Sequence, residues 1–305
     1  MKIPVIDFSI YDEETPETLD KLAEQVDSAL SGIGFMSVAN LGIDNTLREK
    51  VFAASKDFFA SAPDLKNKLG YSGAKENFGY QGVCEEHLKP GAPPDLKEAL
   101  TMRDIYSHRD ADWPSNQFRD TVFEFYGQCF EGARKLGRVF ARVLGVDNKF
   151  FLRAHSGSNV TLRMLHYPPV VAETIGQLGA GEHTDYGMLT LLFQDMEGGL
   201  EVYDKKEDIW QAVKPVEDAI VINTGDLMER WTNGRFLSTL HRVQTRAGQS
   251  DRYSIVVFFD PDDDVMIECL PSCHSSDNPA KYPPIKAGDH ILGKISATHK
   301  EAQGM

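Results

Sequence analysis

The sequence lacks any long uninterrupted apolar run, and this absence excludes a membrane-spanning helix. No window approaches the roughly 18 consecutive apolar residues that cross a bilayer. The first residues, MKIPVIDFSIYDEE, contain one lysine and a short apolar stretch that acidic residues interrupt, unlike a signal or transit peptide. We therefore expect a cytoplasmic protein without a membrane partner.

Basic residues are scarce relative to acidic ones. The chain of 305 residues has 32 Lys and Arg against 46 Asp and Glu, which gives a formal net charge of −14. A surface field of this sign repels phosphate backbones, so we expect no nucleic-acid partner. The sequence also lacks a heptad seam or an obvious apolar interface patch, and we expect a monomer.

Cysteine is the third scarce residue. Cys84, Cys129, Cys269 and Cys273 are too few and too scattered for a disulfide framework, and we expect reduced thiols. Cys269, Cys273 and the adjacent His274 could form a metal clip, but one such pair without a second is a weak zinc pattern.

The first half of the sequence predicts helices. After a short strand at 6–8, residues 15–34 predict a helix capped by Thr15 or Thr18, residues 45–59 a second helix, and residues 113–143 a third that Gly145 ends. Residues 71–94 contain four Gly and three Pro and predict a loop or an extended arm.

From Val160 onward the hydrophobic period becomes that of strands. Because strands and helices do not alternate, a parallel α/β sheet is disfavoured. We predict a mixed α/β (α+β) protein, as one compact unit: a mainly helical region of residues 1–155, a jelly-roll core of residues 156–275 and a C-terminal extension of residues 276–305. The candidate strands are 160–167, 187–194, 199–204, 210–216, 219–225, 240–246, 252–259 and 264–270.

Two ionisable residues stand directly before one of these apolar strands. In GEHTDYGMLTLLF, His183 and Asp185 are two positions apart, and residues at that spacing in a strand share a face. A buried, unpaired carboxylate is costly, and a bound divalent cation would remove that cost. His241 in STLHRV is the best candidate for a third ligand. Two imidazoles and one carboxylate form the facial triad of non-haem Fe(II) oxygenases, which leaves positions open for a bidentate co-substrate and O2.

The His-x-Asp spacing alone is a weak signal, because His108-Arg109-Asp110 repeats it in a polar segment that favours a solvated turn. The first copy differs in what accompanies it. Arg252 and Ser254 follow His241 on a candidate strand and share a face, and a guanidinium beside a hydroxyl can bind a carboxylate. A surface arginine is the alternative for Arg252, and the apolar IVVFF that follows argues against it.

These residues lie in segments that resemble the isopenicillin N synthase-like family of Fe(II)- and 2-oxoglutarate-dependent oxygenases. The likeness runs in order along nearly the whole chain, through IPVIDFS, NFGYQG, DLKEALTMR, LHYPP, HTDYGMLTLLFQD, GGLEV, NTGDLMERWTNGRFLSTLHRV and RYSIVVFFDP. The resemblance implies a double-stranded β-helix core in which His183, Asp185 and His241 hold iron. It further implies that Arg252 and Ser254 hold the distal carboxylate of 2-oxoglutarate.

The resemblance also suggests Tyr167 as a co-substrate contact. Many plant relatives have an asparagine two positions before this tyrosine, where this chain has Leu165. Arg163 lies on the same strand face by parity, and it could supply the missing polar contact, bind substrate or form a structural salt bridge.

The activity that the resemblance implies is oxidation of a small organic substrate by hydroxylation, desaturation or cyclisation, with O2 consumed and succinate and CO2 released. Ascorbate is the expected reductant in vitro. An Fe(II) oxidase of the same fold that does not use 2-oxoglutarate is one alternative, and a non-catalytic jelly roll that binds a small molecule is another. The candidate substrate contacts, each of which could equally be a core or structural residue, are Phe78, Tyr80, Met102, Arg103, Arg163 and Phe259.

Overall fold

Two β-sheets lie on either side of an interior cavity in the computed structural model, which describes residues 3–89, 91–170, 176–245, 248 and 250–300. The strands of these sheets are β1 Val5–Asp7, β2 Phe35–Ala39, β3 Phe78–Gln81, β4 Glu98–Arg103, β5 Val160–Tyr167, β6 Ala180–His183, β7 Leu189–Gln194, β8 Leu200–Asp204, β9 Ile209–Ala212, β10 Ile220–Thr224, β11 His241–Val243 and β12 Arg252–Phe259. The eight-stranded sheet has the order β1-β2-β10-β7-β12-β5-β4-β3, and the four-stranded sheet has the order β6-β11-β8-β9.

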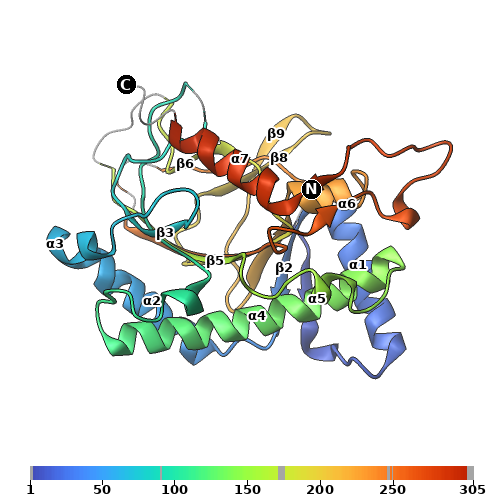
Figure 1. Cartoon of the computed structure of the whole chain (residues 1–305), viewed down its shortest axis with the longest axis horizontal. Coiled ribbons are helices and arrows are strands. Elements are labelled where there is room, and N and C mark those ends of the chain that lie inside the picture. The colour runs from blue at the N-terminus through green and yellow to red at the C-terminus, as the bar shows by residue number, and fades with distance from the viewer. Residues whose placement is uncertain (1–2, 90, 171–175, 246–247, 249, 301–305) are drawn as a thin grey trace.

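Helices cover the outer face of the larger sheet (Figure 1). The helices of the described residues are α1 Pro16–Gly32, α2 Asn45–Ala60, α3 Pro63–Lys66, α4 Asn116–Leu144, α5 Phe150–Arg153, α6 Asp226–Trp231 and α7 Ala287–Lys300, and the last of them lies on the other side of the sheet. Helices α2 and α4 pack on β5, β7 and β12, and α1 packs against α4. None of the helices in the described ranges is long and apolar enough to cross a membrane.

The long helix α4 has the ends that its sequence predicts. The Ser115 hydroxyl accepts a hydrogen bond of 3.0 Å from the backbone N–H of Phe118, which satisfies one of the free donors of the first turn. At the other end Gly145 has a φ of 63°, the left-handed conformation that glycine adopts without strain.

Side chains on the central strands alternate between two environments. On β5 and β12, every second residue belongs to the apolar core beneath the helices, as Met164 and Ile255 do. The intervening residues, among them Leu165 and Val256, line the cavity. Because β5 and β12 pair along their whole length, their cavity-facing residues form one continuous surface.

The helix α7 lies on the cavity side of the large sheet, whereas α4 lies on the other side (Figure 1). Its residues Ile291 and Ile295 line the cavity. The Asp226 carboxylate holds the helix in place, with Oδ2 at 2.8 Å from Lys294 Nζ and 3.4 Å from His290 Nε2. One wall of the cavity is therefore a helix from outside the two sheets.

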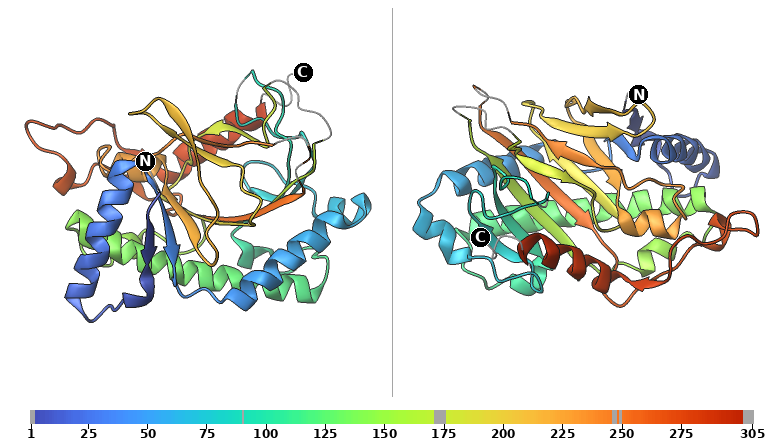
Figure 2. Two further views of the ribbon diagram at one scale, coloured as in Figure 1. Left: turned by 180° about the vertical axis from the view of Figure 1, so that it is seen from behind. Right: turned by 90° about the horizontal axis from the view of Figure 1, so that it is seen from above.

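The structure differs from several sequence predictions. Residues 71–94 contain strand β3, and the first 155 residues contribute β1, β2, β3 and β4 to the large sheet, with β1 and β2 beside α1 (Figure 2). The predicted strand at 264–270 is only the two-residue β13 Met266–Ile267, which pairs with β14 Ile285–Lys286 outside both main sheets. The predicted strand at 240–246 ends at Arg246, which lies outside the described residues.

Smaller differences concern β6 and the start of α1. Strand β6 is absent from the predicted strands, because its sequence AGEH contains no periodic apolar residues. Thr15 occupies the N-cap position of α1, but its hydroxyl bonds to Asp12 and caps no N–H group.

Candidate active site

Three side chains from distant parts of the sequence meet at the cavity. His183 ends β6 and His241 begins β11, and the two residues are directly opposite in this antiparallel pair. Their ring centroids are 4.2 Å apart. Asp185 Oδ1 lies 3.9 Å from His183 Nε2 and 3.6 Å from His241 Nε2. One potential ligand atom from each residue lies within 4.8 Å of the other two.

Asp185 does not lie on a strand, so strand alternation does not explain its position. It lies beyond the end of β6, in the loop before β7, so a shared strand face is the wrong explanation for the convergence. The backbone N–H of Asp226 donates to the Asp185 carbonyl at 2.8 Å. A Cβ at Gly225 would lie 2.7 Å from the same carbonyl oxygen, which explains the glycine beside this loop.

Both histidines present the same ring nitrogen to the cavity. His183 Nδ1 lies 2.7 Å from the Gly181 carbonyl, and His241 Nδ1 lies 3.0 Å from the Thr239 carbonyl. Since a carbonyl only accepts, each Nδ1 carries a hydrogen, so Nε2 is the atom of each ring that can offer a lone pair to a metal. Burial, and then the proximity of the second imidazole, that of His241, lower the pKa of His183, which keeps this ring neutral.

The carboxylate of Asp185 is oriented in a similar way. Its Oδ2 accepts hydrogen bonds from Thr190 Oγ1 at 2.6 Å and from Asn223 Nδ2 at 2.7 Å. Its Oδ1 remains directed at the two imidazoles. Thr190 on β7 and Asn223 on β10 are opposite in the sheet, and both are buried. Sequence reasoning missed both, although each is a polar residue within an otherwise apolar strand.

This donor set fits a divalent cation. Two imidazole Nε2 atoms and one carboxylate oxygen converge, while the remaining polar atoms of all three side chains already have partners within the protein. Two histidines and one carboxylate, with other positions open, are typical of non-haem Fe(II) sites.

A buried guanidinium stands further along the cavity. Arg252 is 2% exposed, and among the described residues no carboxylate forms an ion pair with it. Its Nε donates to the Gly198 carbonyl at 2.5 Å, Nη1 lies 3.4 Å from Ser254 Oγ, and the guanidinium carbon lies 4.7 Å from the centre of the Tyr167 ring. A buried cation of this kind is a natural receptor for an anionic ligand group.

The wall beside Tyr167 contains Leu165 and Arg163, as the parity of β5 predicts. Arg163 forms an ion pair of 2.5 Å with Glu86 and also lines the cavity. The structural salt bridge is therefore present, and it lies on the cavity surface.

Buried polar atoms without partners mark the remaining cavity surface. Among the described residues, Thr101 Oγ1, Arg103 Nε and Arg163 Nε are buried and have no hydrogen-bond partner. Thr101 lies directly opposite Arg163 across the β4–β5 pair. Asp260 also lines the cavity, and burial raises the pKa of its carboxyl to about 7. The cavity has a volume of about 150 Å³.

Several candidate substrate contacts lie outside this cavity. Among the described residues that line it, Arg103 and Arg163 are present, whereas Phe78, Tyr80, Met102 and Phe259 are not. Met102 and Phe259 point to the opposite face of the sheet, since their neighbours Thr101 and Phe258 face the cavity.

The first two aromatic candidates have other partners. Phe78 stacks on His108 at 3.9 Å, which gives the second His-x-Asp copy a packing role away from the triad. The hydroxyl of Tyr80 bonds to Glu98. All four cysteines are free, and the metal-ligating cluster found in the described residues does not include Cys269 or Cys273.

Comparison with known proteins connects this geometry to a family. Residues 158–261 match the sequence model of the 2OG-Fe(II) oxygenase superfamily, and residues 3–121 match that of the non-haem dioxygenase in morphine synthesis N-terminal region. The 2-oxoglutarate-Fe(II) type oxidoreductase hxnY of Emericella nidulans is 34% identical, with 98% of this chain and 91% of that protein covered.

Solved structures are similar over the same extent. A full-length Neurospora crassa protein in complex with alpha-KG superposes with a TM-score of 0.88 at 32% identity and covers 97% of this chain and 96% of its own. A putative 2OG-Fe(II) oxygenase family protein from Caulobacter crescentus superposes with a TM-score of 0.82 at 29% identity, with 97% and 99% covered. The predicted mixed α/β jelly roll is thereby confirmed.

Proposed function

Because the chain belongs to the 2OG-Fe(II) oxygenase superfamily and is an Fe(II)- and 2-oxoglutarate-dependent dioxygenase, we propose that His183, Asp185 and His241 hold its iron. The observation that carries this assignment is the convergence of two free Nε2 lone pairs and one free carboxylate oxygen on the same point of the cavity. When bound, Fe(II) would activate O2, which is the oxidant, and 2-oxoglutarate would supply two electrons as it is converted to succinate and CO2.

Arg252, Ser254 and Tyr167 bind the co-substrate in this proposal. The Arg252 guanidinium and the Ser254 hydroxyl receive the distal carboxylate, and the Tyr167 ring supports the guanidinium from one face. Buried apolar side chains around them, including Leu165 and Val256, keep water away from this ion pair.

The substrate in this proposal is a compact, uncharged molecule with hydrogen-bond acceptor atoms. The unpartnered donors of Thr101, Arg103 and Arg163 require acceptors, because a buried donor left without one costs about 1–3 kcal/mol. The charges around these donors are already balanced in pairs, which leaves no excess positive charge for an anionic substrate. The pairs are Arg163 with Glu86 at 2.5 Å, Lys97 with Asp95 at 2.5 Å and Arg103 with Asp263 at 2.8 Å.

A pyrimidine base satisfies these requirements, since its carbonyl oxygens are neutral acceptors and its ring can contact the aromatic side chains of Tyr186 and Phe258 in the cavity wall. Structures of the same Neurospora crassa protein in complex with thymine and with 5-formyluracil support this choice.

The test measures succinate formation from 2-oxoglutarate by the Fe(II)-loaded enzyme with O2 and ascorbate. We expect thymine or a related pyrimidine to stimulate succinate formation, and Thr101→Val to reduce that stimulation while succinate formation without substrate is unchanged. Stimulation by carboxylated ring compounds alone would contradict the charge argument. Absence of succinate under all conditions would contradict the dioxygenase activity itself.

A further inference from the structure

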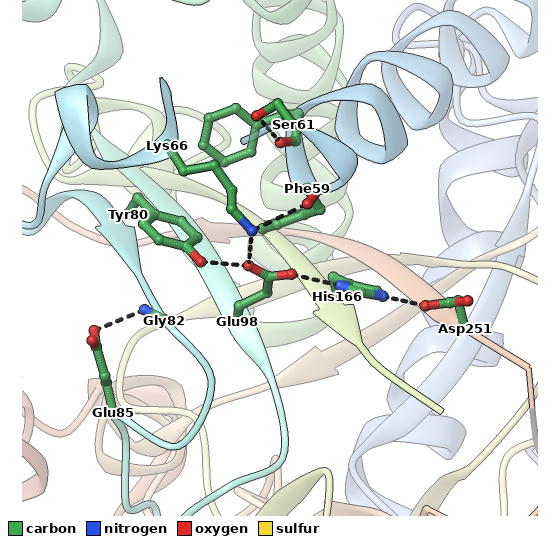
Figure 3. A network of polar contacts seen from close by, with 10 residues as sticks. Phe59, Ser61, Lys66, Tyr80, Gly82, Glu85, Glu98, His166 and Asp251 are labelled. Carbon is green, nitrogen blue, oxygen red and sulfur yellow. Dashed lines mark hydrogen bonds and ion pairs between the residues drawn. The ribbon is translucent and has the colours of Figure 1, made fainter. Parts of the chain in front are cut away.

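His166, on the face of β5 that points away from the cavity, bonds to a carboxylate through each ring nitrogen (Figure 3). Nδ1 lies 2.7 Å from Glu98 Oε1, and Nε2 lies 2.6 Å from Asp251 Oδ1. A neutral imidazole has one N–H and could donate to one carboxylate only. Both contacts together require the imidazolium form. Burial alone would lower the pKa of His166, but the hydrogen bonds to Glu98 and Asp251 outweigh it and raise the pKa.

Glu98 is the fixed side of this arrangement. It lies directly opposite His166 in the β4–β5 pair, and its Oε2 accepts hydrogen bonds from Lys66 Nζ at 2.8 Å and from the Tyr80 hydroxyl at 2.5 Å. Lys66 also donates to the Phe59 carbonyl at the end of α2, at 3.1 Å. Burial alone would raise the pKa of Glu98, but the bonds from His166, Lys66 and Tyr80 lower it to about 2. Glu98 is therefore ionised and held from several elements.

The other side of His166 holds both sequence neighbours of Arg252. Asp251, which precedes Arg252, accepts the hydrogen bond from Nε2. Tyr253, which follows Arg252, stacks on the imidazole with a centroid distance of 4.7 Å and an interplanar angle of 13°. Arg252 itself lies opposite Tyr167 and projects into the cavity. One imidazolium thus secures, from behind the sheet, the two residues that flank this guanidinium.

We propose that His166 is a positioning residue that fixes Arg252 for 2-oxoglutarate, so that the affinity for 2-oxoglutarate falls when His166 loses its proton. This inference depends on the proposed role of Arg252. The charged and titratable groups around the His166 ring, from all elements packed against it, are Glu98, Asp251, Tyr253, Lys66, Tyr80 and Lys56. Of these, Lys56 acts through Tyr253, since its ammonium lies 5.4 Å from the centre of the Tyr253 ring.

The direction of the pH effect follows from these neighbours. A group whose pKa is raised in the folded state keeps its contacts at low pH and loses them as the pH rises through that pKa. The neutral imidazole then keeps one donor. The Glu98 side chain is 6% exposed and must stay paired, whereas the Asp251 side chain is 47% exposed and water can solvate it. Asp251 is therefore the partner released, and the restraint on Arg252 is lost with it.

The experiment measures the dissociation constant of 2-oxoglutarate for the Fe(II)-loaded enzyme without O2, by calorimetry, from about pH 6 to about pH 9. The variants are Asp251→Ala, His166→Gln and Arg252→Met. Asp277→Ala serves as the matched control, because Asp277 is another exposed loop carboxylate. We expect the wild-type dissociation constant to rise with pH, and that of Asp251→Ala to be about fivefold higher at low pH and nearly independent of pH. At saturating 2-oxoglutarate the kcat of Asp251→Ala stays within about twofold of wild type.

Equal dissociation constants and equal pH profiles for wild type and Asp251→Ala would overturn the inference. The proposed function is tested separately by Arg252→Met. If that variant binds 2-oxoglutarate normally, the co-substrate assignment fails. If it binds weakly while Asp251→Ala binds like wild type, only the role of His166 fails. Should His166→Gln not fold, the exposed Asp251 position still decides the question.

Discussion

Replacing Thr190 with valine tests how the protein prepares its carboxylate ligand. The substitution removes the 2.6 Å hydrogen bond from Thr190 Oγ1 to Asp185 Oδ2 and replaces the hydroxyl with a methyl group of similar size. Asn223 remains at 2.7 Å as the second donor to the same oxygen. The carboxylate stays buried at 6% exposure, but one of its two fixed partners is lost.

The expected magnitude follows from two independent considerations. A hydrogen bond to a charged group contributes about 1.5–3 kcal/mol, which corresponds to about 10–100-fold in a binding constant. Loss of a group that orients a metal ligand lowers metal affinity by a similar factor of about 10–100. We therefore expect Thr190→Val to weaken Fe(II) binding by about 10–100-fold. The metal-free protein should lose about 1–3 kcal/mol of unfolding free energy, because the buried carboxylate has lost a donor.

The assay is a competition between the protein and a chelator of known affinity, with Fe(II) and under exclusion of O2. Thr161→Val is the matched control. Thr161 lines the same cavity in the same row of the sheet, with Phe258 between it and Thr190. Unchanged Fe(II) affinity in Thr190→Val, or an equal loss in Thr161→Val, would refute the assignment of Asp185 Oδ1 as the metal-binding atom.

Three further predictions follow from the site. Asp185→Ala should abolish succinate formation measured by chromatography, and iron-dependent turnover by this variant would refute the ligand set. Arg252→Met should raise the KM for 2-oxoglutarate by about 10–100-fold, since it leaves a carboxylate without its buried partner; an unchanged KM would argue against this receptor. Asp260 has a pKa raised from 3.8 to about 7 by burial, so it lowers the stability of the folded protein progressively as the pH rises between those values. Asp260→Asn should therefore show a higher Tm than wild type at pH values above about 7 in metal-free protein, and a smaller difference near pH 4; a constant difference would contradict the role of this carboxyl.

Local patterns were sufficient for the parts of the site that lie on regular strands. The two-residue spacing places Arg163, Leu165 and Tyr167 on one face of β5, and it places Arg252 and Ser254 on one face of β12. The same rule, continued from Arg252, leads to Phe258 and not to Phe259. The choice of Phe259 therefore departs from the alternation rule, whereas the positions of Phe78 and Tyr80 depend on their contacts with His108 and Glu98.

Other features depend on contacts that no local pattern contains. Asp185 lies in an irregular loop whose position is set by Gly225 and Asp226, some 40 residues later in the chain. Thr190 and Asn223 meet because β7 and β10 pair across a long connection. The partners of His166 come from β4 and from the residue before β12. Sequence periodicity identifies which residues are polar within apolar strands, and only the sheet order shows which of them meet.

The origin of the cavity wall in α7 has a consequence for how this enzyme could acquire new substrates. Ile291 and Ile295 line the cavity in which we propose that the substrate binds, yet they belong to a segment that supplies none of the proposed iron or oxoacid contacts. Substitutions along this helix can therefore widen, narrow or recharge the chamber while the oxidising machinery remains intact. A library of variants randomised at these two positions and screened for altered substrate preference would test this expectation.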